Sequence, residues 1–161
     1  MEDKLRGKRI LVVDDEPDVL ETLEELLPMC EVVKASAFEE AKKQLETQTF
    51  DMAILDIMGV DGYKLLEIAA KKKVTAVMLT ANALSPEDTV RSFKAGAAHF
   101  IPKDKITEIT TFLNDIVDEK TGSESLLSKW LDRMDSYYSE KFGRSWKEDD
   151  RQFWSKFDFH T

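Results

Sequence analysis

The segment ILVVDDEP at residues 10–17 decides the fold of this chain. Its four aliphatic residues, 10–13, lead directly into Asp14 and Asp15, and a short apolar run of this kind is typical of a strand buried on both faces. Pro17 suits the first turn of a helix. Apolar residues then recur at helical spacing, at Val19, Leu20, Leu23, Leu26 and Leu27. The segment therefore predicts a buried strand followed by a helix.

The same alternation of strand and helix continues through the first 120 residues. The expected strands are 10–13, 31–35, 52–55, 74–79 and 98–101, and the expected helices are 17–27, 38–45, 63–70, 85–95 and 106–117. Strands that alternate with helices form a parallel sheet with helices on both faces. We therefore expect residues 1–120 to form one α/β domain with a five-stranded, doubly wound parallel sheet.

Residues 121–161 differ in composition from the rest of the chain. They hold nine of the fifteen aromatic residues, and their 7 Lys/Arg nearly balance 8 Asp/Glu, whereas residues 1–120 carry 16 against 24. Two helical patterns are visible: Leu127, Trp130, Leu131, Met134, Tyr137 and Tyr138, then Ser145, Glu148, Phe153, Trp154 and Phe157. We expect a C-terminal α-helical extension that is joined at Thr121-Gly122-Ser123. Its apolar face should pack on the first domain, within the extension or on a second chain.

Charge and cysteine content exclude several classes of protein. The formal net charge of −9 argues against binding to nucleic acid or anionic lipid, since both need a basic face. Cys30 is the only cysteine, so the chain can form no internal disulfide, as is typical of the reducing cytoplasm. No apolar run approaches the roughly 20 residues that cross a bilayer, and no signal peptide is visible. We expect a cytoplasmic protein that contacts neither nucleic acid nor membrane.

Polar residues follow four of the five expected strands. Asp14 and Asp15 end the first strand, Asp56 the third and Thr80 the fourth, while Lys103 follows the fifth. Ligands of parallel sheets bind at the carboxyl ends of the strands, so these side chains should converge on one cleft. Any one of them could simply cap a helix, but together they indicate a site.

The chemistry of this set points to phosphate. Two unit charges about 5 Å apart repel by roughly 3 kcal/mol at an effective dielectric near 20, so three clustered carboxylates need a counter-charge. Hard oxygen ligands favour Mg²⁺, which leaves room for phosphate oxygens. Lys103 offers a second positive group, and Thr80 offers a hydroxyl donor. These are the parts needed to transfer a phosphoryl group to an aspartate.

The chain from about Lys8 to Lys120 resembles the receiver domain of bacterial two-component response regulators. The resemblance rests on ILVVDDEP at 10–17, MAILDIM at 52–58, DGYKLL at 61–66, VMLTANA at 77–83 and AGAAHFIPK at 95–103. It implies a flavodoxin-like fold and a switch that a sensor histidine kinase or phosphotransfer protein phosphorylates. Such a switch would signal through protein contacts, with partner binding or self-association through the C-terminal helices.

The resemblance also implies a magnesium site beside the phosphoryl acceptor. Asp56 would be the acceptor, Asp15 a direct Mg²⁺ ligand, and Asp14 a residue that holds the ion through water. Asp56 itself and the Met58 carbonyl would complete the ligands. Only four residues separate Asp56 from Asp61, whereas the family usually has six, and this shorter loop could tilt the Met58 carbonyl.

Three further residues acquire roles from the resemblance. Thr80 and Phe100 would be the switch pair, and Lys103 would reach the phosphoryl group. The family usually places a proline after this lysine, often with a cis bond, but here Pro102 precedes it. A cis bond before Asp104 would cost about 3 kcal/mol, so the chain lacks the usual reason for one.

We do not expect an enzyme that turns over an external substrate, because the phosphorylation and dephosphorylation would be self-catalysed. Two alternatives remain open. A Mg²⁺-dependent phosphohydrolase of the haloacid-dehalogenase kind also combines Asp, Thr and Lys, but it needs a second Asp two residues after the nucleophile. Glu16 and Met58 occupy the two candidate positions. A degenerate receiver that acts only as a binding module would lack an acidic residue or the lysine, and this chain has them all.

Overall fold

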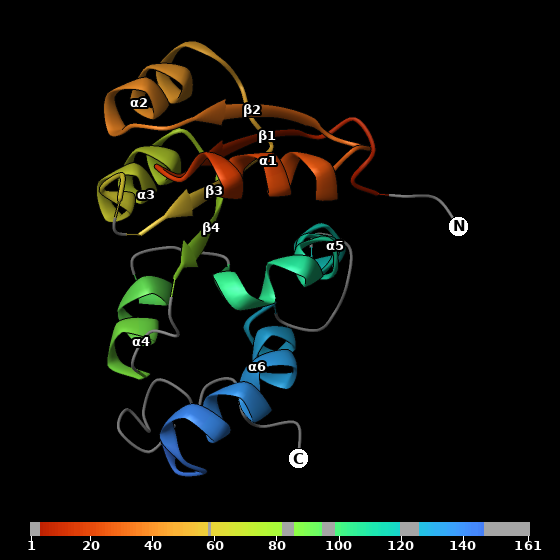
Figure 1. Cartoon of the computed structure of the whole chain (residues 1–161), viewed down its shortest axis with the longest axis vertical. Coiled ribbons are helices and arrows are strands. Elements are labelled where there is room, and N and C mark those ends of the chain that lie inside the picture. The colour runs from red at the N-terminus through yellow and green to blue at the C-terminus, as the bar shows by residue number, and fades with distance from the viewer. Residues whose placement is uncertain (1–3, 58, 82–85, 95–98, 120–125, 147–161) are drawn as a thin grey trace.

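Five parallel strands form a single sheet in the order β2-β1-β3-β4-β5 (Figure 1). The computed structural model describes residues 4–57, 59–81, 86–94, 99–119 and 126–146. The strands are β1 (Arg9–Val13), β2 (Glu31–Ala35), β3 (Met52–Asp56), β4 (Thr75–Thr80) and β5 (His99–Pro102). All neighbouring strands pair in parallel. The expected doubly wound α/β fold is confirmed.

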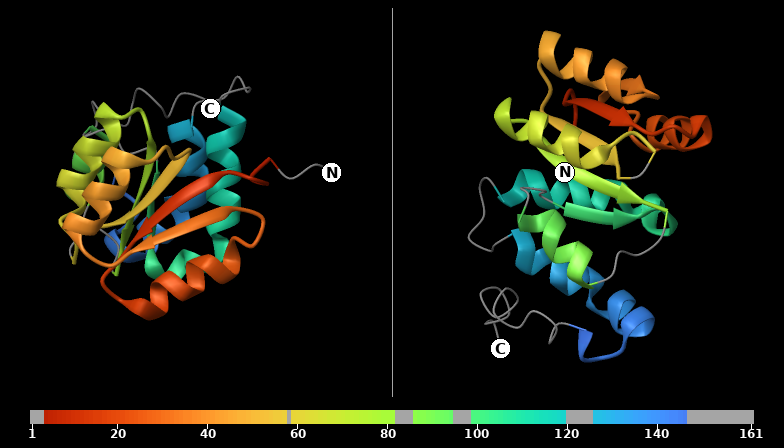
Figure 2. Two further views of the ribbon diagram at one scale, coloured as in Figure 1. Left: turned by 90° about the horizontal axis from the view of Figure 1, so that it is seen from above. Right: turned by 90° about the vertical axis from the view of Figure 1, so that its left-hand side faces the viewer.

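Helices cover both faces of this sheet (Figures 1 and 2). They are α1 (Pro17–Leu26), α2 (Phe38–Thr47), α3 (Gly62–Lys71), α4 (Pro86–Lys94), the 3₁₀ helix η1 (Lys103–Glu108), α5 (Ile109–Glu119) and α6 (Leu126–Phe142). Helices α2, α3 and α4 lie on one side of the sheet, and α1 and α5 lie on the other. Most boundaries differ from expectation by one or two residues at most, and the largest difference is that the helix predicted over 106–117 starts only at Ile109, because the 3₁₀ helix η1 precedes it.

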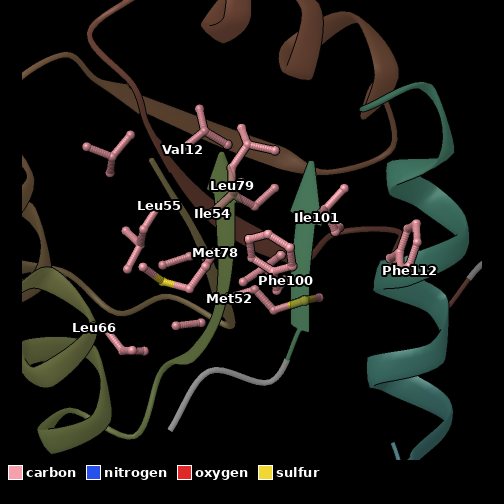
Figure 3. Close-up of a cluster of buried hydrophobic side chains, with 14 of the residues drawn as sticks. Val12, Met52, Ile54, Leu55, Leu66, Met78, Leu79, Phe100, Ile101 and Phe112 are labelled. Atoms are coloured by element: carbon pink, nitrogen blue, oxygen red, sulfur yellow. The ribbon is translucent and has the colours of Figure 1, made fainter. Parts of the chain in front are cut away.

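The hydrophobic core lies on both faces of the central strands. Buried side chains from the strands and helices meet there, and Figure 3 labels Val12, Met52, Ile54, Leu55, Leu66, Met78, Leu79, Phe100, Ile101 and Phe112. Every residue of β3 is buried, whereas the edge strand β2 is largely exposed or half-buried. Burial on both faces explains why the central strands are continuous aliphatic runs.

The C-terminal helix α6 lies beyond β5, between α4 and α5 (Figure 1). The extension buries Trp130, Leu131, Met134, Tyr138 and Trp146. The expected helix with an apolar face is therefore present, and it packs on the first domain. The predicted joint at 121–123 and most of the second helical pattern lie outside the described residues, so the boundary between 120 and 121 stays a prediction.

Candidate functional site

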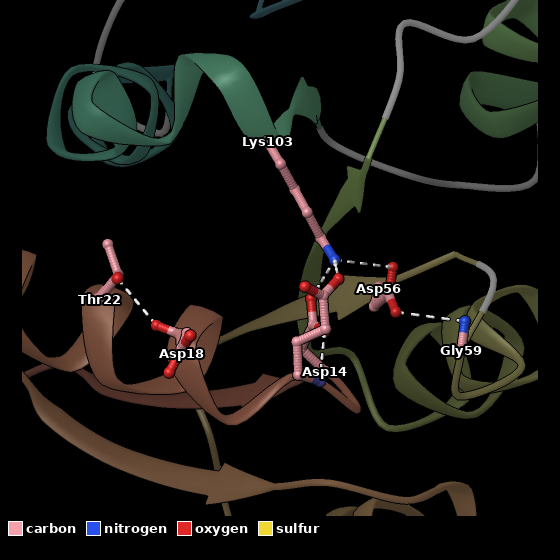
Figure 4. A network of polar contacts seen from close by, with 7 residues as sticks. Asp14, Asp18, Thr22, Asp56, Gly59 and Lys103 are labelled. Carbon is pink, nitrogen blue, oxygen red and sulfur yellow. Dashed lines mark hydrogen bonds and ion pairs between the residues drawn. The ribbon is translucent and has the colours of Figure 1, made fainter.

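The carboxyl ends of four strands bring predicted site residues together, and Figure 4 shows Asp14, Asp56 and Lys103 among them. Asp14 directly follows β1, Asp56 ends β3 and Thr80 ends β4, while Lys103 directly follows β5. Lys103 Nζ lies 2.8 Å from Asp14 Oδ2 and 3.8 Å from Asp56 Oδ1. Asp56 is paired in register with Leu79, so Thr80 lies one position beyond it on the neighbouring strand. The convergence that the sequence predicted is thus present for these groups.

Lys103 is the positive centre of the site. Only 14% of its side chain is exposed, and its ammonium also contacts Glu16 Oε1 at 2.8 Å. Burial by itself lowers the pKa of Lys103, but the close contacts of its ammonium with the Asp14 and Glu16 carboxylates outweigh burial and raise it. The lysine therefore stays protonated across the physiological range.

Glu16 was not among the residues that the sequence indicated as interacting with Lys103. Its carboxylate is exposed and comes from the start of α1, 87 positions away along the chain. The only available signal was the third acidic residue in the run Asp14-Asp15-Glu16. The contact makes Glu16 a competitor for any anion that Lys103 is to bind.

Asp14 and Asp56 are the two buried carboxylates of the site, and burial makes the ionised form of each less favourable. Asp14 is fully buried, and desolvation raises its pKa against the opposing effects of Lys103 and the Glu16 backbone N–H, which donates to Asp14 Oδ1 at 2.9 Å. Desolvation also raises the pKa of Asp56, and the negative charge of Asp14 adds to this shift. Such raised acid pKa values are typical of functional sites.

The acidic end of this site fits a hard cation. Carboxylate oxygens of Asp14, Asp15 and Glu16 lie within 4.8 Å of one another. Asp14 Oδ2 is buried and, among the described residues, no donor meets it in hydrogen-bonding geometry, although Lys103 balances its charge. An oxygen of this kind can accept a metal ion or one of its waters. The compact trio includes Glu16 rather than the expected Asp56, and Met58 lies outside the described residues.

The short loop after Asp56 closes tightly against the site. The Gly59 N–H donates to Asp56 Oδ2 at 3.2 Å. A Cβ atom at position 59 would lie 2.4 Å from the Asp15 carboxylate, so a side chain there would displace that carboxylate. The loop ends at Asp61, whose φ of 56° turns the chain into α3. The shortened loop therefore contacts the carboxylates of both Asp56 and Asp15.

The remaining predictions concern β5 and the segment after it. The described residues contain no cis peptide bond, so the bond between Lys103 and Asp104 is trans. Phe100 is fully buried, with its ring centroid 6.4 Å from those of both Trp130 and Tyr138 on α6. Its backbone carbonyl accepts a hydrogen bond of 2.7 Å from the Trp130 indole. The sequence did not identify this contact between Phe100 and the extension.

Comparison with known proteins gives a consistent result. The family model described as the response regulator receiver domain matches residues 10–114. The two-component response regulator ARR18 of Arabidopsis thaliana is 34% identical over 103 residues, which is 60% of this chain and 16% of that protein. The alkaline phosphatase synthesis transcriptional regulatory protein PhoP of Bacillus subtilis is 34% identical over 102 residues, 60% of this chain and 42% of that protein. The chain thus matches less than half the length of either relative.

Solved structures agree with these relatives. A CheY-like response regulator receiver domain protein from Methanospirillum hungatei has a TM-score of 0.64 at 32% identity, covering 72% of this chain and 99% of that one. The response regulator TrrA from Thermotoga maritima, solved in complex with Mg²⁺-BeF, has a TM-score of 0.52 at 39% identity, covering 59% and 85%. None of the helices in the described part of the chain is both long and apolar enough to span a bilayer.

Proposed function

The chain belongs to the response regulator receiver domain family, and we propose that it is a phosphorylation-dependent switch in which Asp56 accepts the phosphoryl group. The observation that carries this assignment is the position of Asp56. Its buried carboxylate ends β3, lies 3.8 Å from Lys103 Nζ and accepts the Gly59 N–H. A positive group and a backbone donor thus flank the oxygens of one carboxylate.

The transfer is a nucleophilic substitution at phosphorus. A carboxylate oxygen of Asp56 forms the new P–O bond, while the bond between phosphorus and the donor's leaving group breaks and its electron pair leaves with that group. Lys103 and the Thr80 hydroxyl then hold the phosphoryl oxygens as donors. Bound Mg²⁺ supplies additional positive charge to those oxygens. Asp14 and Asp15, with Asp56 and the Met58 carbonyl, are our proposed ligands.

The partners follow from the same family. Receiver domains interact with histidine kinases or phosphotransfer proteins, and we assign one of these as the phosphoryl donor. The net charge of −9 and the composition of residues 121–161 favour output through protein contacts, without nucleic acid or membrane. We assign residues 1–120 to the receiver and 121–161 to a helical extension that takes part in output. A cytoplasmic location fits the lone cysteine.

The decisive experiment is incubation with acetyl phosphate and Mg²⁺, followed by intact-mass spectrometry. The wild type should gain about 80 Da, the mass of one phosphoryl group, and Asp56→Asn should gain nothing because an amide is not a carboxylate nucleophile. Asp61→Asn is the matched control and should still be phosphorylated. Multiple turnover of phosphate esters would instead identify a phosphohydrolase, and the absence of any adduct on the wild type would identify a binding module.

A further inference from the structure

The α6 helix is held on the first domain by specific polar contacts as well as by apolar burial. The Trp130 indole donates to the Phe100 carbonyl at 2.7 Å, and the Tyr138 and Thr89 hydroxyls share a hydrogen bond of 2.6 Å. Trp130, Tyr138 and Thr89 are all fully buried. A helix that merely covered apolar surface would not need such matched buried donors and acceptors.

Two further contacts lie beside these. Arg133 donates through Nε and Nη2 to the two carboxylate oxygens of Asp115 on α5, and the Nη2–Oδ1 distance is 2.9 Å. The Tyr137 hydroxyl donates to both carboxylate oxygens of Asp104 at 3.1 Å. The helix contacts therefore recur at i, i+3, i+7 and i+8 along one face of α6, which is the spacing of a helix docked on a surface.

The segment from Phe100 to Asp104 joins this docking surface to the phosphorylation site. Lys103 extends into the site, where it contacts Asp14 and lies near Asp56. Its neighbour Asp104 accepts a hydrogen bond from the Tyr137 hydroxyl of α6, and Phe100, three residues before Lys103, lies against the rings of Trp130 and Tyr138 on that helix. One five-residue segment thus contacts the site through Lys103 and α6 through Phe100 and Asp104.

We propose that the surface formed by Thr89, Phe100, Asp104 and Asp115 is a docking site for an amphipathic aromatic helix. Its occupant in the unphosphorylated chain is α6, and phosphorylation of Asp56 weakens this docking. The inference rests on the proposed function. A phosphoryl group on Asp56 draws Lys103 away from Asp14 and Glu16, because its oxygens compete for the same ammonium. Phe100 and Asp104 then shift, and their contacts with Trp130 and Tyr137 loosen.

Coupling of this kind acts in both directions. If phosphorylation weakens the docking of α6, then loosening α6 must favour the phosphorylated state by the same factor. The two directions can be measured separately on the full chain. Beryllofluoride with Mg²⁺ serves as the probe in both, because it binds reversibly in place of a phosphoryl group.

The first measurement follows indole N–H signals by NMR. The Trp130 signal should shift and its hydrogen should exchange faster when beryllofluoride is added, because its acceptor is the Phe100 carbonyl. The Trp146 indole, which donates to Asp135 within the extension at 2.9 Å, is the internal reference and should change less. The Gly59 amide, bonded to Asp56, reports whether the probe has bound.

The second measurement is the half-saturating concentration of beryllofluoride in two variants. Tyr138→Phe removes the hydroxyl that bonds Thr89 but keeps the ring, and this concentration should fall about 3- to 10-fold, as expected for one buried hydrogen bond. Ser136→Ala removes an exposed hydroxyl from the same helix and should leave it unchanged.

The outcomes separate the two proposals. The coupling is refuted, and the proposed function stands, if beryllofluoride shifts the Gly59 amide signal but not the Trp130 signal, and if Tyr138→Phe has the same half-saturating concentration as the wild type. If neither the Gly59 nor the Trp130 signal responds, both proposals are refuted.

Discussion

Replacing Lys103 by methionine should destabilise the metal-free protein substantially. Methionine keeps much of the length of the side chain and removes its charge. Lys103 lies 2.8 Å from both Asp14 and Glu16 and 3.8 Å from Asp56, and it is the cation that the described residues bring to these acids. Without it, the fully buried Asp14 carboxylate loses its counter-charge.

The size of the expected loss in free energy of unfolding depends on which of these ion pairs is buried. Two charges 2.8 Å apart attract by about 6 kcal/mol at an effective dielectric of 20, but desolvation offsets most of this. Breaking a buried pair typically costs about 3–5 kcal/mol, whereas an exposed pair such as that with Glu16 contributes about 1 kcal/mol or less. Because Lys103 keeps 14% of its side chain exposed, we expect a loss near the lower figure, about 3 kcal/mol.

The stability that Lys103→Met loses relative to wild type should become smaller as pH falls. Burial already raises the pKa of Asp14 above its ordinary value, and removing the lysine raises it further. The folded variant then binds more protons than the unfolded chain between the ordinary pKa, about 3.9, and the raised one. Its stability relative to wild type therefore improves as pH falls through this window.

Urea denaturation of metal-free protein at pH 7 and near pH 5 measures both effects. Lys105→Met is the matched control, because Lys105 pairs at 3.5 Å with Glu108 on the surface, and it should change the free energy of unfolding by less than about 0.5 kcal/mol. A Lys103→Met variant that is as stable as this control at pH 7, or whose stability relative to wild type does not improve near pH 5, would refute the assignment of Lys103 as the counter-charge of the buried acids.

Two other substitutions test the loop and the extension. Gly59→Ala should weaken Mg²⁺ binding about tenfold or more in a calorimetric titration, because the new Cβ would displace the Asp15 carboxylate. Stability should change little, since this carboxylate is exposed and can rotate away. Unchanged Mg²⁺ affinity would show that Asp15 is not held in place for the ion. Arg133→Gln should cost about 1–2 kcal/mol in urea denaturation, discounted for the 42% exposure of Arg133, since it leaves the buried Asp115 without its partner. The control is Arg144→Gln, which replaces an exposed arginine after α6. Equal stability of the two variants would contradict a stabilising role for the Arg133–Asp115 pair.

The fold was predictable because its signals are local. The aliphatic run of β3 has every residue buried, so its hydrophobic pattern reports its environment directly. The start of α5 was not predictable in the same way. The spacing of Ile106, Ile109 and Leu113 suits one continuous helix, yet residues from Lys103 to Glu108 form a 3₁₀ helix that carries Lys103 into the site.

The site was predictable for a topological reason. All strands of a parallel sheet end at the same edge, so Asp56 after β3 and Lys103 after β5 lie at that edge, with only β4 between their strands. The contact between Lys103 and Glu16 depends on how the start of α1 faces that edge, which no local pattern encodes. Likewise, the aromatic face of α6 indicates a buried helix, but not that Trp130 would bond the carbonyl of Phe100.

The identity of the phosphorylated residue tests the central claim most directly. Trypsin cleavage after Lys43 and Lys64 gives one peptide that contains Asp51, Asp56 and Asp61. After treatment with acetyl phosphate and Mg²⁺, borohydride reduction converts an aspartyl phosphate to homoserine, and fragment-ion spectra of this peptide locate the change. We predict homoserine at Asp56, with Asp51 and Asp61 unmodified as controls within the same peptide. Homoserine at either of those two residues, or in another peptide, would contradict the assignment of Asp56 as the acceptor.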